Sequence, residues 1–372
     1  MHPMMGGKSV NVAICGGGTG GHLHPLLALA EELASHDDVE VALYLSRKSP
    51  SSALLDSKKV VPLEVKGFIR GFDLANFGAL ADLIRAFRRC RREMKVDAPV
   101  VAAAFGGYAS VPGAAAALSL GVPLVIHEQN VIPGLANRML APWARVLAVS
   151  FPQTLDRCRG WRGKAVVTGN PLLRKPEPAG VEEARRYFGL EEARRTLAVV
   201  GGSQGAASLN RAVLEAVPEW ADRSDVQIIH CVGRDKYQEF MADAAKVASG
   251  GLIYRTMEFV ERMDLLYRAA DLVVCRAGAS TIAELAASGC AAILVPYPHA
   301  TAAHQDANAS VLVAQGAAVI IEDRDLDGHR LREEADRLLG DEERLRSMRE
   351  AALGAGKPQA AANLAAAVLS LV

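Results

Sequence analysis

The stretch GGGTGGHLHP, residues 16–25, lies between an apolar run, residues 10–15, and a helical pattern of apolar residues. A run of this length is typical of a buried strand, and the glycines after it predict a tight turn into a helix. Such a turn points unpaired backbone N–H groups and the positive end of the helix dipole outward, where they can bind a phosphate. The stretch therefore predicts a strand–turn–helix unit with an anion site at its turn.

The same pattern recurs along the chain, because strand-sized apolar runs alternate with helical patterns. This alternation indicates βαβ units and a parallel sheet. It starts again after TGNPLLRKPEPAG (168–180), whose glycines and prolines are typical of an interdomain linker. The expected strands lie within residues 10–15, 39–45, 99–105, 123–127, 145–150, 196–205, 226–233, 271–278 and 290–297.

We therefore predict an α/β protein with two tandem Rossmann-like domains, residues 1–170 and 171–355. The remaining segment, residues 356–372, is a strong helix former with no strand after it, and we expect it to cross back to the first domain.

Composition narrows the class of protein. Lys and Arg number 42 and Asp and Glu number 42, so no global field attracts nucleic acid, and we expect no nucleic-acid partner. The six cysteines form no C-x-x-C pair and are expected to be buried, reduced thiols, which is typical of the cytosol. Residues 1–9 have no apolar core of a secretory signal, and the Ala-rich stretch 111–126 predicts a helix followed by a strand. These features indicate a soluble or peripheral protein.

A second glycine turn, GGSQG (201–205), opens the second half, and Ser203 can add a hydroxyl donor to a phosphate. The first turn also satisfies G-x-G-x-x-G, the dinucleotide fingerprint. That fingerprint needs an acidic residue after the second strand, whereas this chain has Arg47 and Lys48 there. An NADP-dependent oxidoreductase is therefore kept as an alternative.

Polar clusters follow three further strands, where open α/β sheets bind ligands. The first is HEQN (127–130) and the second is RAGASTIAEL (276–285), in which Ser280 or Thr281 is expected to cap a helix and Glu284 to lie on its first turn. Glu284 there either complements the helix dipole or accepts the hydroxyls of a ribose. The third cluster, residues 296–308, contains His299, His304, Gln305 and Asn308. The histidine spacing matches no compact metal motif, and we expect no metal.

Together these segments resemble the MurG family of glycosyltransferases, in the family's order and over nearly the whole chain. The matching motifs are GGGTGGHLHP, FGGYASVP (105–112), HEQNVIPGLANR (127–138), TGNP (168–171), GGSQGAASLN (201–210) and RAGASTIAEL. The resemblance implies a GT-B fold, with the acceptor bound by the first domain, UDP-GlcNAc by the second, and the active site in the cleft between them. It implies no cofactor. A UDP-sugar 2-epimerase shares this architecture and is the other alternative.

The activity implied by the resemblance is the transfer of N-acetylglucosamine from UDP-GlcNAc to undecaprenyl-pyrophosphoryl-muramyl-pentapeptide. The enzyme would be peripheral, at the cytoplasmic face of the plasma (inner) membrane. It would serve peptidoglycan synthesis and, through it, cell-wall biogenesis, cell shape, cell division and the cell cycle.

The resemblance also implies roles for individual residues of the donor site. Thr19, Gly20 and Gly21 would face the transferred sugar, with Asn130 and Gln305 as further sugar ligands. Ser203 would contact the diphosphate, and the backbone of Val260 would bind uracil. The donor stretch that would hold diphosphate and ribose comprises Ala279, Ser280, Thr281, Ile282, Ala283 and Glu284, the last of these on the ribose hydroxyls.

The acceptor is expected to contact Gly18, Gly106, Gly107, Tyr108 and His127. The chain departs from the family at NPLLRK, where Leu173 occupies the position of the family's arginine. Arg174 follows one position later, so its expected donor contact requires a shift of the loop.

Two residues are candidates for the general base of an inverting displacement, in which the acceptor hydroxyl loses a proton and UDP leaves. His22 follows the first glycine turn, and Glu128 directly follows the predicted strand 123–127, as the second residue of HEQN. His22 is the preferred candidate, and His24 is expected to be structural.

A membrane-docking surface is predicted over residues 66–95. Phe68, Ile69, Phe72, Leu74 and Phe77 precede a helical pattern of Leu80, Leu83, Ile84 and Phe87. Six basic residues follow between Arg85 and Lys95, against one acid, Glu93. Apolar side chains could enter the interface of an anionic membrane while arginines meet its headgroups. The alternative is a helix packed on the first domain with a solvated basic face.

Overall fold

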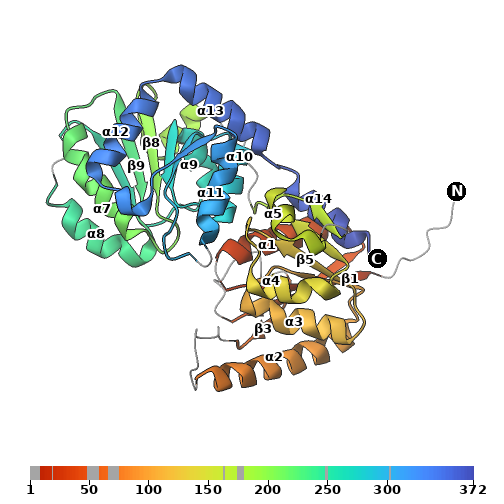
Figure 1. Ribbon diagram of the computed structural model, residues 1–372. Helices are drawn as coiled ribbons and strands as arrows, with labels where there is room; N and C mark the ends of the chain where they lie inside the picture. The colour runs from red at the N-terminus through yellow and green to blue at the C-terminus, as the bar shows by residue number, and fades with distance from the viewer. Residues whose placement is uncertain are drawn as a thin grey trace. The chain divides into compact units, whose positions relative to one another are not determined.

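The computed structural model describes residues 9–18, 20–47, 58–65, 75–161, 164–173, 180–247, 250–300 and 303–372. The chain forms two compact units, Met1–Leu173 with Pro358–Val372, and Arg174–Lys357. Each is built on a parallel sheet with helices on both faces (Figure 1). The predicted pair of Rossmann-like domains is confirmed.

In the first unit the described strands form a seven-stranded sheet of order β3-β2-β1-β4-β5-β6-β7. The direction of strand succession reverses between β1 and β4, which is where such sheets bind ligands. The strands are β1 (Val10–Gly16), β2 (Val39–Ser46), β3 (Lys59–Leu63), β4 (Val101–Ala104), β5 (Leu124–Glu128), β6 (Val146–Val149) and β7 (Ala165–Val167). The helices are α1 (Gly20–Ala34), α2 (Ala75–Asp97), α3 (Gly107–Ser119), α4 (Leu135–Leu140), η2 (Ala141–Trp143), α5 (Gln153–Arg157), η3 (Arg159–Trp161) and α14 (Ala360–Leu369).

Alternation along β1 divides the core of this unit between the two faces of the sheet. Val12 and Ile14 pack with α1 and α14, whereas Ala13 and Cys15 pack with α2 and α3. The C-terminal helix α14 contacts α1, β4 and β6 and so crosses back to the first unit, as predicted (Figure 1).

In the second unit the described strands form a six-stranded sheet of order β10-β9-β8-β11-β12-β13. The corresponding reversal lies between β8 and β11. The strands are β8 (Arg195–Val200), β9 (Val226–Cys231), β10 (Ile253–Met257), β11 (Leu272–Cys275), β12 (Ala292–Leu294) and β13 (Ala318–Ile320). The helices are α6 (Val181–Tyr187), α7 (Ala207–Ala216), η4 (Val217–Trp220), η5 (Arg234–Lys236), α8 (Tyr237–Ala244), α9 (Met263–Ala269), α10 (Ala279–Ser288), α11 (His304–Ala314), η7 (Asp323–Asp325), α12 (Gly328–Leu339) and α13 (Glu342–Ala355).

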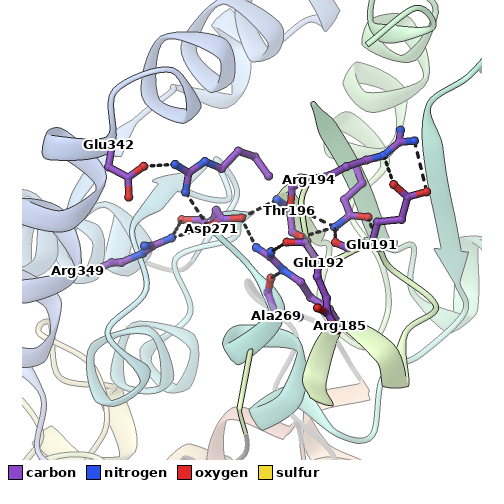
Figure 2. A network of polar contacts seen from close by, with 11 residues as sticks. Arg185, Glu191, Glu192, Arg194, Thr196, Ala269, Asp271, Glu342 and Arg349 are labelled. Carbon is purple, nitrogen blue, oxygen red and sulfur yellow. Dashed lines mark hydrogen bonds and ion pairs between the residues drawn. The ribbon is translucent and has the colours of Figure 1, made fainter. Parts of the chain in front are cut away.

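A buried carboxylate joins four elements at the amino ends of β8 and β11. Asp271 accepts hydrogen bonds from Arg185 of α6, Arg349 of α13 and the backbone N–H of Thr196, at 2.6, 2.9 and 2.7 Å (Figure 2). Arg195 approaches the same carboxylate at 3.4 Å and also pairs with Glu342. The network therefore holds α6 and α13 to the edge of the sheet that lies opposite the carboxyl ends of its strands.

All six cysteines are free, and five of them are buried. The expectation of buried thiols is wrong for Cys158, which is half-buried at the end of the short helix α5. In the part of the chain that the structure describes, no helix is long and apolar enough to cross a membrane.

Candidate functional site

The first glycine turn leads from β1 into α1. Gly17 and Gly18 both have φ of 102°, a conformation that favours glycine. A Cβ at Gly18 or Gly21 would meet no atom within 4 Å, so both positions border open space. His22 is the third residue of α1 and is half-buried. Thr19, predicted to face the sugar, lies outside the described residues.

The turn after β4 brings a second glycine pair beside His22. Gly106 and Gly107 have φ of 77° and 67°, and α3 begins at Gly107. A Cβ on Gly107 would lie 3.5 Å from Nε2 of His22. Tyr108 is half-buried and packs against the core on the α2–α3 face of the sheet. Of the residues expected to bind the acceptor, Gly107 is thus adjacent to the preferred base.

A chain of side-chain hydrogen bonds connects His22 to the end of β5. Nδ1 of His22 lies 3.2 Å from Oε1 of Gln129. Nε2 of Gln129 lies 3.1 Å from Nδ1 of His127, whose Nε2 lies 3.1 Å from the carbonyl oxygen of Gly169. His127 is buried, and burial lowers its pKa to about 4, so this imidazole is neutral near pH 7.

Glu128 is buried and its carboxylate already accepts four hydrogen bonds. Oε1 accepts from the backbone N–H and side-chain amide of Asn130, at 2.9 and 3.3 Å. Oε2 accepts from the backbone N–H of Gly134 and from Nδ2 of Asn137, at 3.0 and 2.8 Å. Four donors match the approximate lone-pair capacity of a carboxylate. Through these bonds Glu128 orders the 129–137 segment, including Asn130.

Two helices of the second unit, α7 and α10, begin directly after glycine-containing turns at the carboxyl ends of β8 and β11. The turn before α7 needs glycine, because a Cβ on Gly205 would lie 2.4 Å from the carbonyl oxygen of Val232. Ser203 is exposed in this turn. Val260 is buried and lines a pocket after β10 in which the Arg234 guanidinium stacks 4.1 Å from the centroid of the Phe259 ring.

The start of α10 differs from the sequence prediction. Gly278 is the N-cap with no side-chain capping bond, so the expected cap by Ser280 or Thr281 is wrong. Since the helix begins at Ala279, Glu284 lies on its second turn and not on the first. The first intrahelical bond joins Ile282 N–H to the carbonyl oxygen of Gly278, which leaves the preceding helical N–H groups without intrahelical partners.

Two polar side chains of α10 differ in how they are paired. Oγ of Ser280 is buried and has no hydrogen-bond partner in the described part of the chain. Glu284 accepts a hydrogen bond of 2.8 Å from the hydroxyl of Tyr267. Burial raises the pKa of Glu284 to about 7, against a smaller lowering by that hydrogen bond. A ligand hydroxyl near this carboxylate would gain a strong acceptor.

Gln305 is engaged with the backbone. Its Oε1 accepts hydrogen bonds from the N–H groups of Ala277 and Tyr297, at 3.2 and 2.9 Å. It therefore ties together the chain leaving β11 and β12. Arg174, one residue beyond Leu173, lies outside the described residues.

Sequence reasoning did not single out three residues that organise these sites. Gln129 belongs to the polar cluster HEQN and contacts His22 directly. Asn137 binds Glu128, and Tyr267 binds Glu284. Each of these three residues bonds a partner nine or more positions away in the chain, and such pairings leave no local pattern in the sequence. The polar cluster HEQN, which contains Gln129, is the one sequence feature that pointed to any of them.

Comparisons with known proteins agree with this arrangement. Residues 12–149 match the N-terminal domain of glycosyltransferase family 28, and residues 196–364 match its C-terminal domain. A protein of Listeria monocytogenes is 37% identical over 98% of this chain and 100% of its own length. One of Halothermothrix orenii is 36% identical over 94% and 96%. Both are named UDP-N-acetylglucosamine--N-acetylmuramyl-(pentapeptide) pyrophosphoryl-undecaprenol N-acetylglucosamine transferase.

Among solved structures, Acinetobacter baumannii MurG has a TM-score of 0.75 at 28% identity, covering 97% of this chain and 99% of that one. A putative UDP-N-acetylglucosamine 2-epimerase from Listeria monocytogenes has a TM-score of 0.73 at 16% identity, covering 98% and 96%. The latter likeness shows the fold alone. The matched domains and the full-length relatives place the chain in glycosyltransferase family 28, to which it belongs.

Proposed function

We propose that this protein transfers N-acetylglucosamine from UDP-GlcNAc to a lipid-linked muramyl-pentapeptide, the reaction for which its relatives are named. The observation that carries the proposal is the match to those relatives over nearly the whole length of both chains. A product of this kind would serve peptidoglycan synthesis, and through it cell shape and division.

The second unit supplies groups suited to a nucleoside diphosphate sugar. The N-termini of α7 and α10 offer backbone N–H groups and dipoles to the diphosphate, with Ser203 and the unpartnered Ser280 hydroxyl as further donors. Glu284 would accept the ribose hydroxyls, and the backbone of Val260 would bind uracil. Charge on the leaving UDP would then be met by helix termini and hydroxyls.

The Glu284→Gln variant is expected to stabilise the ligand-free protein while weakening donor use. The raised pKa means that ionising Glu284 costs folding free energy: the cost is absent below about pH 4.5, grows as pH rises and is complete above about pH 7. Removing it should increase the free energy of unfolding at about pH 8 by up to about 3 kcal/mol. The substitution replaces one of the two acceptor oxygens by an NH₂ group, which cannot accept from a ribose hydroxyl, and should raise the KM for UDP-GlcNAc by the equivalent of roughly 1–3 kcal/mol.

Denaturant unfolding at high and low pH and donor kinetics would measure both effects. Glu239→Gln, whose carboxylate is 76% exposed, is the matched control and should change stability by less than about 0.5 kcal/mol. An unchanged donor KM in Glu284→Gln would remove the ribose assignment.

The first unit would present the acceptor to His22. The acceptor hydroxyl oxygen forms a bond to the anomeric carbon while the bond from that carbon to the UDP oxygen breaks. The hydroxyl proton passes to Nε2 of His22, and UDP leaves with the electron pair. One displacement of this kind inverts the anomeric configuration. The remaining expected ligands, Thr19 and Arg174 among them, belong to the same proposal.

The test is UDP release in the presence of a water-soluble muramyl-pentapeptide acceptor. Transfer should require both substrates and persist in EDTA. Interconversion of UDP-GlcNAc without acceptor would instead favour the epimerase, and stabilisation by NADPH but not by UDP would favour the oxidoreductase.

The outer face of α2 supports association with an anionic membrane surface. Ala79, Ala86, Cys90 and Met94 bury one face of the helix against the core, and α2 packs on α3. The remaining surface of the helix carries Leu80 and Ile84, which are 47% and 43% exposed, and the exposed basic residues Arg85, Arg88, Arg89, Arg92 and Lys95. Arg91 is half-buried and donates to the hydroxyl of Ser119 on α3. The predicted aromatic residues 68, 72 and 77, with Ile69 and Leu74, have no described side chains. An amphipathic helix with this distribution suits the cytoplasmic leaflet that holds a lipid-linked acceptor.

Charge reversal of Arg88, Arg89 and Arg92 to glutamate should weaken binding to anionic vesicles by at least about 100-fold, since each basic residue contributes about 1 kcal/mol. Binding by the wild type should also weaken with salt. Vesicle sedimentation measures both effects, and activity on the water-soluble acceptor should be retained. Reversal of Arg186, Arg211 and Arg324, exposed on the second unit, changes net charge equally and serves as the control. Equal loss of binding in both triple variants would show that only net charge matters.

A further inference from the structure

The amide of Gln129 has one orientation that satisfies its surroundings. Its Nε2 lies 3.0 Å from the carbonyl oxygen of Phe105 and 3.4 Å from that of His127. Carbonyl oxygens only accept hydrogen bonds, so the NH₂ group must lie there. The reversed amide would place Oε1 of Gln129 against the carbonyl oxygen of Phe105. Gln129 and Phe105 are both buried, so no solvent could relieve this repulsion. Oε1 of Gln129 is therefore the atom that faces His22.

The imidazole of His127 enforces the same orientation from the other side. Its Nε2 must donate to the carbonyl oxygen of Gly169, 3.1 Å away. Because the buried ring is neutral, its Nδ1 carries a lone pair and accepts from Nε2 of Gln129 at 3.1 Å. Both hydrogens of the Gln129 amide nitrogen thus have acceptors: the carbonyl oxygen of Phe105 and Nδ1 of His127.

These constraints extend to His22. An amide oxygen can only accept, so Nδ1 of His22, 3.2 Å from Oε1 of Gln129, must carry a hydrogen. In the neutral ring the lone pair is then on Nε2. Gly107 lies beside Nε2 of His22, since a Cβ on Gly107 would be 3.5 Å from that nitrogen.

We propose that Gln129 and His127, anchored on the backbone carbonyls of Phe105 and Gly169, hold His22 in the tautomer with its proton on Nδ1. Both are positioning residues. His127, which the resemblance implies as an acceptor contact, is 1% exposed with both ring nitrogens engaged, and in this proposal it acts through Gln129 and not on the substrate. The use of the Nε2 lone pair as the base rests on the proposed function, whereas the tautomer does not. The arrangement connects three segments, 127–130, 105–107 and 168–170, to one nitrogen atom of α1.

The tautomer is measured directly by ¹⁵N NMR of the full chain labelled at its histidines, at about pH 8.5, where an ordinary imidazole is neutral. The His22→Gln variant identifies the His22 signals by their loss. Wild-type His22 should show a protonated Nδ1 and an unprotonated Nε2. Gln129→Met, which keeps length but removes the acceptor, should shift the proton toward Nε2.

Kinetics provide a second readout. Gln129→Met should lower kcat by about 10- to 100-fold, part of what a general base contributes, while the KM for UDP-GlcNAc stays unchanged. His24→Gln, at an exposed position two residues along the same helix, should change neither the His22 signals nor kcat.

A wild-type His22 that is protonated on Nε2 when neutral would overturn the proposal, and this result needs no folded variant. An unchanged His22 tautomer in folded Gln129→Met would also overturn it. If instead the tautomer is as stated and His22→Ala retains full turnover, the proposed base fails while the tautomer assignment stands.

Discussion

Replacing His22 by alanine is expected to lower kcat by about 10²–10⁴-fold, the usual contribution of a general base. The KM for UDP-GlcNAc should change little, because a base acts in the transition state and the groups proposed to bind the UDP part of the donor are on the second unit. Steady-state kinetics with a water-soluble acceptor would measure the separation of kcat from KM. UDP should stabilise the variant against heat as much as it stabilises the wild type.

Glu128→Gln is the informative comparison, since both residues were candidates from sequence. The buried carboxylate accepts four hydrogen bonds, and an amide would set an NH₂ group against two of the N–H donors. Leaving buried donors unpaired costs roughly 1–3 kcal/mol each, so the main expected effect is a lower free energy of unfolding. If His22→Ala kept its turnover while a folded Glu128→Gln lost it, the base would be Glu128.

The sequence predicted the central strands of both sheets and missed the strands at their edges. Central parallel strands are buried on both faces and read as continuous apolar runs, which is why β1 and β8 were evident. The missed strands are β3, β7, β10 and β13, the outermost strands of the two sheets. They are short or mixed in polarity: β3 contains Lys59 and Pro62, and Val166 in β7 is 42% exposed. Edge strands of this kind carry little periodic signal.

The sequence located the candidate sites at turns whose backbone conformation favours glycine. The turns after β1, β4 and β8 contain glycines at positive φ, a need that the residue type itself reveals. The start of α10 was misplaced because its N-cap, Gly278, makes no side-chain capping bond that a Ser or Thr would have signalled. The partner of His22 was missed because Gln129 is 107 positions away in the chain. Long-range hydrogen bonds have no sequence period from which to infer them.

The largest expected loss of stability is at Asp271, far in sequence from the residues proposed for chemistry. The Asp271 side chain is 7% exposed, and its carboxylate lies within 3.4 Å of side-chain nitrogens of Arg185, Arg195 and Arg349 (Figure 2). Asp271→Asn keeps the shape but removes the charge that the three guanidinium groups share. Arg195 retains Glu342, whereas Arg185 is itself buried and would lose its anion.

Breaking a buried ion pair by removing one partner typically costs about 3–5 kcal/mol, so Asp271→Asn should lower the free energy of unfolding by that amount. Denaturant unfolding of the full chain would measure it. Asp225→Asn is the matched control, because Asp225 also pairs with an arginine, Arg223, at 2.6 Å but is 64% exposed. Exposed pairs contribute about 0–1 kcal/mol, so the control should be nearly neutral. Equal losses in the two variants would contradict the view that burial, and not pairing alone, sets the cost at Asp271. Solvent screens the Arg223–Asp225 pair, whereas the Arg185 side chain is only 10% exposed.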